Sequence, residues 1–284
     1  MFINRSFSVT VIVMIVISMS QHCFCQNPKS LNSSMANGFS PAVATWYGSP
    51  TGSGSGGACG FADDVATAPY NGMISAGNDN IFKSGKGCGS CYQVRCNKHP
   101  SCSTSPITLT ITDQCPGACN NVPYHFDLSG KAFGLLAKHG QEDALRKAGI
   151  IDIEFQRYIN LSRFQHLEFI FQYTFFSFRV PCSYKSNIVF KIDMGSNRNY
   201  LAFAVEYVNS DGDLGAVELS PSNSKPIAMK QSWGATWETG IPEGVKGPYS
   251  VKITTIESRR SVVARNVIPV DWAPGKYYHA SVNL

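Results

Sequence analysis

Alternation of apolar and polar residues divides the chain into two β-rich regions. In the first, runs with a period of two predict strands over residues 92–96, 107–112 and 151–155, and the folded part begins near Ala42. Two short helices are predicted over residues 129–137, capped by Ser129, and over residues 141–148, ended by Gly149. Short strands with one or two helices indicate a small β-barrel.

A second region of strands begins near Val180. Strands are predicted over residues 188–192, 200–207, 216–219, 249–256, 261–267 and 277–282, with turn residues at 211–213 and 221–224. Strands of this length separated by turns predict an antiparallel sandwich. The fold class is therefore mostly β, with two domains at residues 45–157 and 179–284.

The segment between the domains, residues 158–178, has a different pattern. It carries eight aromatic residues in 21 positions and follows no steady strand or helix period. Arg163, His166 and Glu168 interrupt it, which argues against a membrane-spanning helix. The segment therefore belongs to neither domain.

The N-terminal residues predict export. Arg5 precedes an uncharged apolar run at residues 9–17, which is too short to cross a bilayer. Residues 1–25 are interpreted as a signal peptide, so the mature chain is expected to be secreted. Residues 26–44 are predicted to be a flexible polar leader, and Asn32 begins an Asn-Ser-Ser sequon for N-glycosylation.

Composition fits a secreted globular protein. The 284 residues are 43% hydrophobic and 15% charged, which is enough apolar sequence for two cores. A net charge of +5 predicts neither nucleic-acid binding nor a polybasic membrane patch. Of ten cysteines, two lie in the signal peptide, and the remaining even number suits disulfides. Zinc at Cys88 and Cys91 is the alternative, but without a second C-x-x-C or an H-x-x-x-H element no metal site is expected.

Seven short motifs follow one another along the chain. They are Thr45-Trp46-Tyr47-Gly48, Gly56-Gly57-Ala58-Cys59-Gly60-Phe61, Gly87-Cys88-Gly89-Ser90-Cys91-Tyr92, Ile111-Thr112-Asp113-Gln114-Cys115-Pro116-Gly117, His125-Phe126-Asp127-Leu128-Ser129-Gly130-Lys131-Ala132-Phe133-Gly134, Val180-Pro181-Cys182 and Ser232-Trp233-Gly234-Ala235. In this order they resemble plant β-expansins over residues 42–157 and 179–284. The resemblance implies a double-psi β-barrel similar to glycoside hydrolase family 45, followed by an immunoglobulin-like carbohydrate-binding sandwich. It also implies the disulfides Cys59–Cys88, Cys91–Cys182 and Cys96–Cys102, which leaves Cys115 to pair with Cys119.

Residues 158–178 have no counterpart in that family. Its members run almost directly from a sequence like residues 154–157 to one like residues 180–182. We interpret the extra segment, which lies between Arg157 and Arg179, as a retained intron. A genuine surface loop is the alternative.

The resemblance also implies a cleft in the first domain, formed by Thr45, Tyr47, Asp113, His125 and Asp127. Asp127 matches the general acid of the hydrolases, which burial and hydrogen bonding must keep protonated. The alternative for Asp127 is a cap of the turn before Ser129. Asp113 is either a partner carboxylate or a structural hydrogen-bond acceptor.

A second catalytic carboxylate does not occur where a hydrolase base is expected. Assisted hydrolysis of a glycosidic bond normally uses two carboxyl groups. The stretch from Thr45 to Phe61 contains no Asp or Glu, and Asp63 and Asp64 follow only after Cys59. The chain is therefore predicted not to be an enzyme, and the cleft is interpreted as vestigial.

Aromatic side chains are predicted to bind polysaccharide, because rings cover the apolar face of a sugar while polar groups bind its edges. The resemblance implies this role for Trp46, Tyr47, Tyr200 and Trp233. A core position is the alternative for Tyr200 and Trp233. Trp237 and Trp272 are interpreted as packing residues.

These observations predict a secreted, monomeric protein of the plant cell wall that loosens the wall without hydrolysis. The expected partners are cellulose and matrix glucans such as xyloglucan or arabinoxylan, and no cofactor is expected. The alternatives are a weak endoglucanase and a carbohydrate-binding wall or defence protein without loosening activity.

Overall fold

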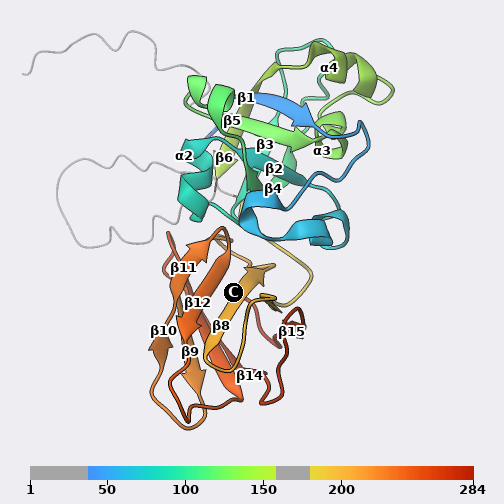
Figure 1. The fold of residues 1–284 in the computed structure, drawn as a ribbon. Helices are drawn as coiled ribbons and strands as arrows, with labels where there is room; N and C mark the ends of the chain where they lie inside the picture. Colours follow the sequence, from blue (N-terminus) through green and yellow to red (C-terminus); the bar gives the residue numbers. More distant parts are fainter. Residues whose placement is uncertain (1–37, 158–179) are drawn as a thin grey trace, which may run out of the picture.

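The computed structural model describes residues 38–157 and 180–284. Four predictions lie outside these residues: the signal peptide, most of the leader, the Asn32 sequon and the 158–178 segment. Figure 1 shows a barrel domain, blue to green, above a sandwich domain in orange. Within the described residues, no helix has the length and apolar character needed to span a bilayer.

Six strands close the first domain into a barrel. They are β1 (Ser40–Tyr47), β2 (Ile74–Gly77), β3 (Cys91–Arg95), β4 (Ile107–Gln114), β5 (His125–Ser129) and β6 (Ile151–Arg157), in the order β1-β5-β2-β4-β3-β6. The pairs β1/β5 and β2/β4 are parallel, and the other pairs are antiparallel. The core contains fully buried Leu109, Ile111, Phe126, Leu128 and Phe133.

The helices of this domain are short. They are α2 (Asp79–Phe82), α3 (Gly130–Leu135) and α4 (Glu142–Ala148), with 3-10 turns η3 (Gly57–Cys59), η4 (Ala62–Ala66), η5 (Lys83–Gly85) and η6 (Gly117–Asn121). The predicted cap of α3 is confirmed, because Ser129 Oγ accepts a hydrogen bond from Ala132 N at 3.0 Å. Helix α4 ends at Gly149, whose φ of 73° suits glycine.

Two sheets form the second domain. One has the order β10 (Ile227–Ala228), β9 (Leu214–Pro221), β13 (Tyr249–Thr255), β14 (Ser261–Ile268). The other has the order β11 (Lys230–Trp233), β12 (Thr236–Gly240), β8 (Tyr200–Glu206), β7 (Val189–Ile192), β15 (Tyr277–His279). Between them, Phe190 and Phe203 meet edge to face with ring centroids 5.3 Å apart. The predicted fold class, a barrel followed by a sandwich, is confirmed.

Some boundaries differ from the prediction. Strand β1 begins at Ser40, inside the segment predicted as a leader, because Ala42 and Ala44 are buried and β1 pairs with β6 from its first residue. Strand β2 has four buried residues and therefore shows no polar alternation. Strands β5, β10, β11 and β12 were likewise absent from the prediction.

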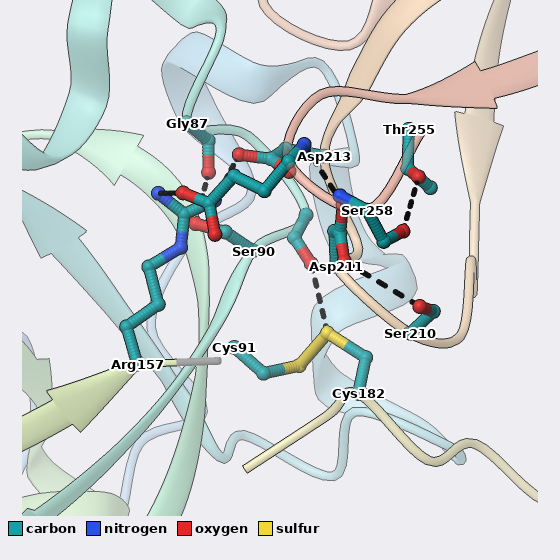
Figure 2. A network of polar contacts seen from close by, with 12 residues as sticks. Gly87, Ser90, Cys91, Arg157, Cys182, Ser210, Asp211, Asp213, Thr255 and Ser258 are labelled. Atoms are coloured by element: carbon teal, nitrogen blue, oxygen red, sulfur yellow. Dashed lines mark hydrogen bonds and ion pairs between the residues drawn. A yellow bond between two sulfur atoms is a disulfide. The ribbon is translucent and has the colours of Figure 1, made fainter. Parts of the chain in front are cut away.

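The two domains are joined covalently and by a buried ion pair. Figure 2 shows the Cys91–Cys182 disulfide beside Arg157, the last residue of β6, which contacts Asp213 of the second domain. Arg157 Nη1 also lies 3.1 Å from Glu257 Oε1. The structure contains three further disulfides, Cys59–Cys88, Cys96–Cys102 and Cys115–Cys119, so all four pairs coincide with those implied by the resemblance.

Candidate functional site

Strand register brings three of the five predicted cleft residues, Thr45, Asp113 and Asp127, into one row. Thr45 of β1 pairs with Asp127 of β5, and Asp127 pairs with Ala76 of β2. Ala76 in turn pairs with Asp113 of β4, so the row crosses four strands. Asp113 and Asp127 are thus two strand spacings apart, about 10 Å between their Cα atoms.

Asp127 forms a polar cluster with its neighbours. Thr45 Oγ1 donates to Asp127 Oδ1 at 2.5 Å and lies 2.9 Å from His125 Nε2. Burial raises the pKa of Asp127, and Asp113 adds to this effect, whereas the Thr45 hydrogen bond and His125 oppose it. Burial lowers the pKa of His125. The alternative that Asp127 caps a turn before Ser129 is wrong, because residues 125–129 form strand β5.

Asp113 has a structural contact in the cleft. Its Oδ1 accepts hydrogen bonds from Ala58 N at 2.7 Å and from Gln114 N at 2.8 Å. The carboxylate lies so close to Gly57 that a Cβ at that position would overlap it. Asp113 therefore fixes the Gly57–Cys59 turn, which favours the acceptor role, while its charge still acts on Asp127.

Tyr47 covers the cleft from the end of β1. It shares a strand face with Thr45, and its Oη accepts a hydrogen bond from Ser55 N at 2.9 Å. Gly54, at φ +75°, packs against the phenol ring, where a larger residue would not fit. Burial raises the pKa of Tyr47 to about 12, and the charges of Asp113 and Asp127 add to it. Tyr47 therefore stays a neutral hydroxyl that can donate or accept a hydrogen bond.

The structure does not bring Trp46 into this group. Neighbouring residues of a strand point to opposite faces, so Trp46 lies on the face opposite to Tyr47. Its ring packs against the barrel core, 6.5 Å from the ring of Phe133. Its Nε1 donates to Arg146 O at 3.1 Å. These contacts are those of a packing residue.

Trp233 lies where the two domains meet. It is 49% exposed, so the alternative of a core position is wrong for this residue. Its ring packs against Gly60 of the first domain, where an added Cβ would lie 2.8 Å from the ring. By contrast, Trp237 is buried and Trp272 packs against the sandwich core, as predicted for both.

Tyr200 lies on the same sheet face as Trp233. Leu201 and Phe203 point into the core, so Tyr200 and Ala204 point outward, and Ala204 pairs with Thr236, the partner of Trp233. The two aromatic residues are thus about 13 Å apart along the strand direction, the length of four strand residues, and two strand spacings apart across the sheet. We call Trp233, Tyr200 and the residues between them the outer sheet face.

Two polar residues of the outer sheet face, Ser232 and Glu238, were not identified as candidate site residues from the sequence. Glu238 Oε2 accepts hydrogen bonds from Tyr200 Oη and from Ser232 Oγ, each at 2.7 Å. These bonds lower the pKa of Glu238 and raise that of Tyr200 to about 12. Only the register of β12 on β8 reveals the cluster, since Glu238 pairs with Ala202.

Comparison with known proteins identifies both halves of the chain. The Expansin C-terminal domain model matches residues 188–269, and a model described as lytic transglycolase matches residues 74–155. Expansin-B4 of Arabidopsis thaliana is 44% identical over 265 residues, covering 92% of each chain. Expansin-B1 of Zea mays is 45% identical over 251 residues, covering 86% of this chain and 83% of its own.

A solved structure has the same two-domain fold. A mutant Clavibacter michiganensis expansin in complex with cellohexaose superposes with a TM-score of 0.60 at 20% identity, covering 86% of this chain and 97% of that chain. On the identities shared with the two plant proteins over most of its length, the chain belongs to the expansin family.

Proposed function

We propose that the protein is secreted to the plant cell wall, binds cellulose and matrix glucans, and loosens the wall without hydrolysing them. The observation that carries the proposal is the position of Trp233. A half-exposed tryptophan of the second domain lies against Gly60 of the first, beside the turn that Asp113 holds. The outer sheet face therefore continues toward the cleft and can contact one extended polymer.

The chemistry of these surfaces suits a β-linked glucan. Trp233 and Tyr200 offer rings for the apolar faces of sugars, and Glu238 and Ser232 offer polar groups for the hydroxyl edges. The expansin that shares this fold was crystallised with cellohexaose, which supports the same class of ligand here.

The cleft supports binding more than hydrolysis. Asp127 is suited to an acid role, since burial raises its pKa. Asp113 is the nearest described carboxylate of the row, but two backbone amides hold its Oδ1 against the turn. Asp64 forms an ion pair at the domain junction instead, where Lys191 Nζ lies 2.6 Å from its Oδ2. Water attack on a bound glucan therefore lacks an evident base.

Loosening without hydrolysis is energetically reasonable. Single hydrogen bonds between polymers contribute only about 1 kcal/mol net in water. A protein that replaces several contacts in sequence can therefore let two chains slip without breaking a covalent bond. The cleft and the outer sheet face would hold one polymer while its neighbour is displaced.

Binding and sugar release, measured on one preparation, test the proposal. Purified protein should sediment with insoluble cellulose and with wall matrix glucan, and it should release no reducing sugar. If soluble glucans release reducing sugar and Asp127→Asn abolishes that release, the protein is an endoglucanase. If it binds wall polymers and never extends a wall strip, it is a carbohydrate-binding protein without loosening activity.

A further inference from the structure

Glu238 lies midway between Trp233 and Tyr200 on the outer sheet face. Two residues before it along β12, Thr236 pairs with Trp233. Two residues after it, Gly240 pairs with Tyr200. Each separation is about 7 Å along the strand direction. Since β12 lies between the strands that carry the two rings, a polymer that touches both rings passes over Glu238.

Two hydroxyl groups hold the Glu238 carboxylate on this face. Trp237 packs in the sandwich core, so its neighbour Glu238 points outward. Oε2 accepts hydrogen bonds from Tyr200 Oη and Ser232 Oγ, each at 2.7 Å. Within the described residues, Oε1 has no hydrogen-bond partner. The carboxylate is therefore fixed in position and keeps one oxygen available for a sugar hydroxyl.

The negative charge of Glu238 is only partly offset by its surroundings. Lys230 is its cross-strand partner on β11, but the two form no ion pair within the part of the chain that the structure describes. The hydrogen bonds from Tyr200 and Ser232 lower the pKa of Glu238, so it is ionised at the pH of most binding assays. Asp193 adds a second negative charge that acts on Tyr200. This part of the face is thus negative in a chain whose net charge is +5.

We propose that Glu238 makes the outer sheet face selective for neutral glucans over polymers that carry uronic acids. A hydroxyl of a neutral sugar donates to the carboxylate, and such a charge-assisted bond is stronger than one to a neutral acceptor. A uronate brings a second carboxylate to the same place, where the two charges repel each other. This inference rests on the proposed function, because it specifies which class of polymer the same surface binds.

Two hexasaccharides of the same linkage test the proposal. Cellohexaose is neutral, whereas the β-1,4-linked hexamer of glucuronic acid carries a carboxylate on every sugar. Calorimetric titration at pH 6 gives a Kd for each ligand with the full chain as wild type, as Glu238→Gln and as the control Glu218→Gln. Glu218 points outward from β9 in the other sheet, since Val217 and Leu219 are buried. The control therefore removes the same charge from a different surface.

The two Kd values should move in opposite directions in Glu238→Gln. We expect cellohexaose to bind about fivefold more weakly and the acidic hexamer about threefold more tightly. The preference for the neutral ligand should thus fall about tenfold or more, and salt at about 1 M should reduce this change. Glu218→Gln should keep the wild-type preference. A preference within twofold of wild type in Glu238→Gln, an equal fall in both variants, or a wild type that prefers the acidic hexamer would overturn the proposal.

Tyr200→Phe separates the charge of Glu238 from its contact with the ring. This variant loses the hydrogen bond and keeps the carboxylate, so its preference for the neutral ligand should stay near that of wild type. A fall as large as in Glu238→Gln would assign the selectivity to the position of the ring and refute the role of the charge.

Trp233→Ala separates this inference from the proposed function. If wild type does not bind cellohexaose, or if Trp233→Ala leaves that binding unchanged, the outer sheet face is not the binding surface and both proposals fail. If Trp233→Ala weakens binding while Glu238→Gln keeps the wild-type preference, only the selectivity proposal fails.

Discussion

Replacing Trp233 with alanine removes the ring that links the outer sheet face to the first domain. The residue is 49% exposed, so roughly half of the ~250 Å² of a tryptophan, about 120 Å², is free to contact a sugar. At about 25 cal/mol per Å² this area corresponds to about 3 kcal/mol if it were all covered. A sugar covers one face of the ring, and binding orders both partners. We therefore expect a loss of about 1–2 kcal/mol, roughly a 5- to 30-fold rise in Kd.

A sedimentation isotherm on insoluble cellulose measures this loss. Val270→Ala is the matched control, because it truncates a 62% exposed apolar side chain in the loop after β14 and should leave Kd unchanged. Thermal unfolding should show that Trp233→Ala folds like wild type. A Kd within twofold of wild type for Trp233→Ala, or an equal loss in Val270→Ala, would refute the assignment of the binding surface.

Three further predictions concern the domain junction and the cleft. Gly60→Ala and Gly117→Ala both place a side chain at positive φ. Each should lower stability by about 1–2 kcal/mol, as measured by thermal unfolding. Only Gly60→Ala displaces Trp233, so it alone should weaken cellulose binding, and equal binding by the two variants would contradict this contact. Replacing Cys91 and Cys182 together with alanine opens a 91-residue loop and should cost about 4–5 kcal/mol in denaturant unfolding; a loss below ~1 kcal/mol would contradict the chain-entropy reasoning. Because the native pKa of Asp127 is raised, the protein should lose stability as pH rises through that pKa. Asp127→Asn should remove this part of the dependence when thermal unfolding is followed as a function of pH. An unchanged dependence of stability on pH would argue against a protonated Asp127.

Much of the fold could be predicted from local pattern. Strands whose sequence alternates between apolar and polar residues, such as β4 and β13, were found close to their true bounds. Strand β2 was not predicted because all four of its residues are buried, and β11 was not predicted because three of its four residues are exposed. In both cases, the surroundings rather than the local pattern make the segment a strand.

The candidate site depended on long-range register and was harder to predict. The resemblance identified Thr45 and Asp127, but the contact between Asp113 and the Gly57–Cys59 turn joins residues 55 positions apart. Alternation along β1 places Trp46 on the face opposite to Tyr47, so its predicted role in binding polysaccharide remains a prediction.

The extension of a clamped, heat-inactivated plant wall strip under constant load tests the central claim most directly. Reducing sugar released into the same bath should be measured throughout. We predict that wild-type protein starts a steady extension, that sugar release stays at the level of buffer alone, and that Trp233→Ala extends the strip more slowly. Extension that rises in step with sugar release, with both lost in Asp127→Asn, would contradict loosening without hydrolysis.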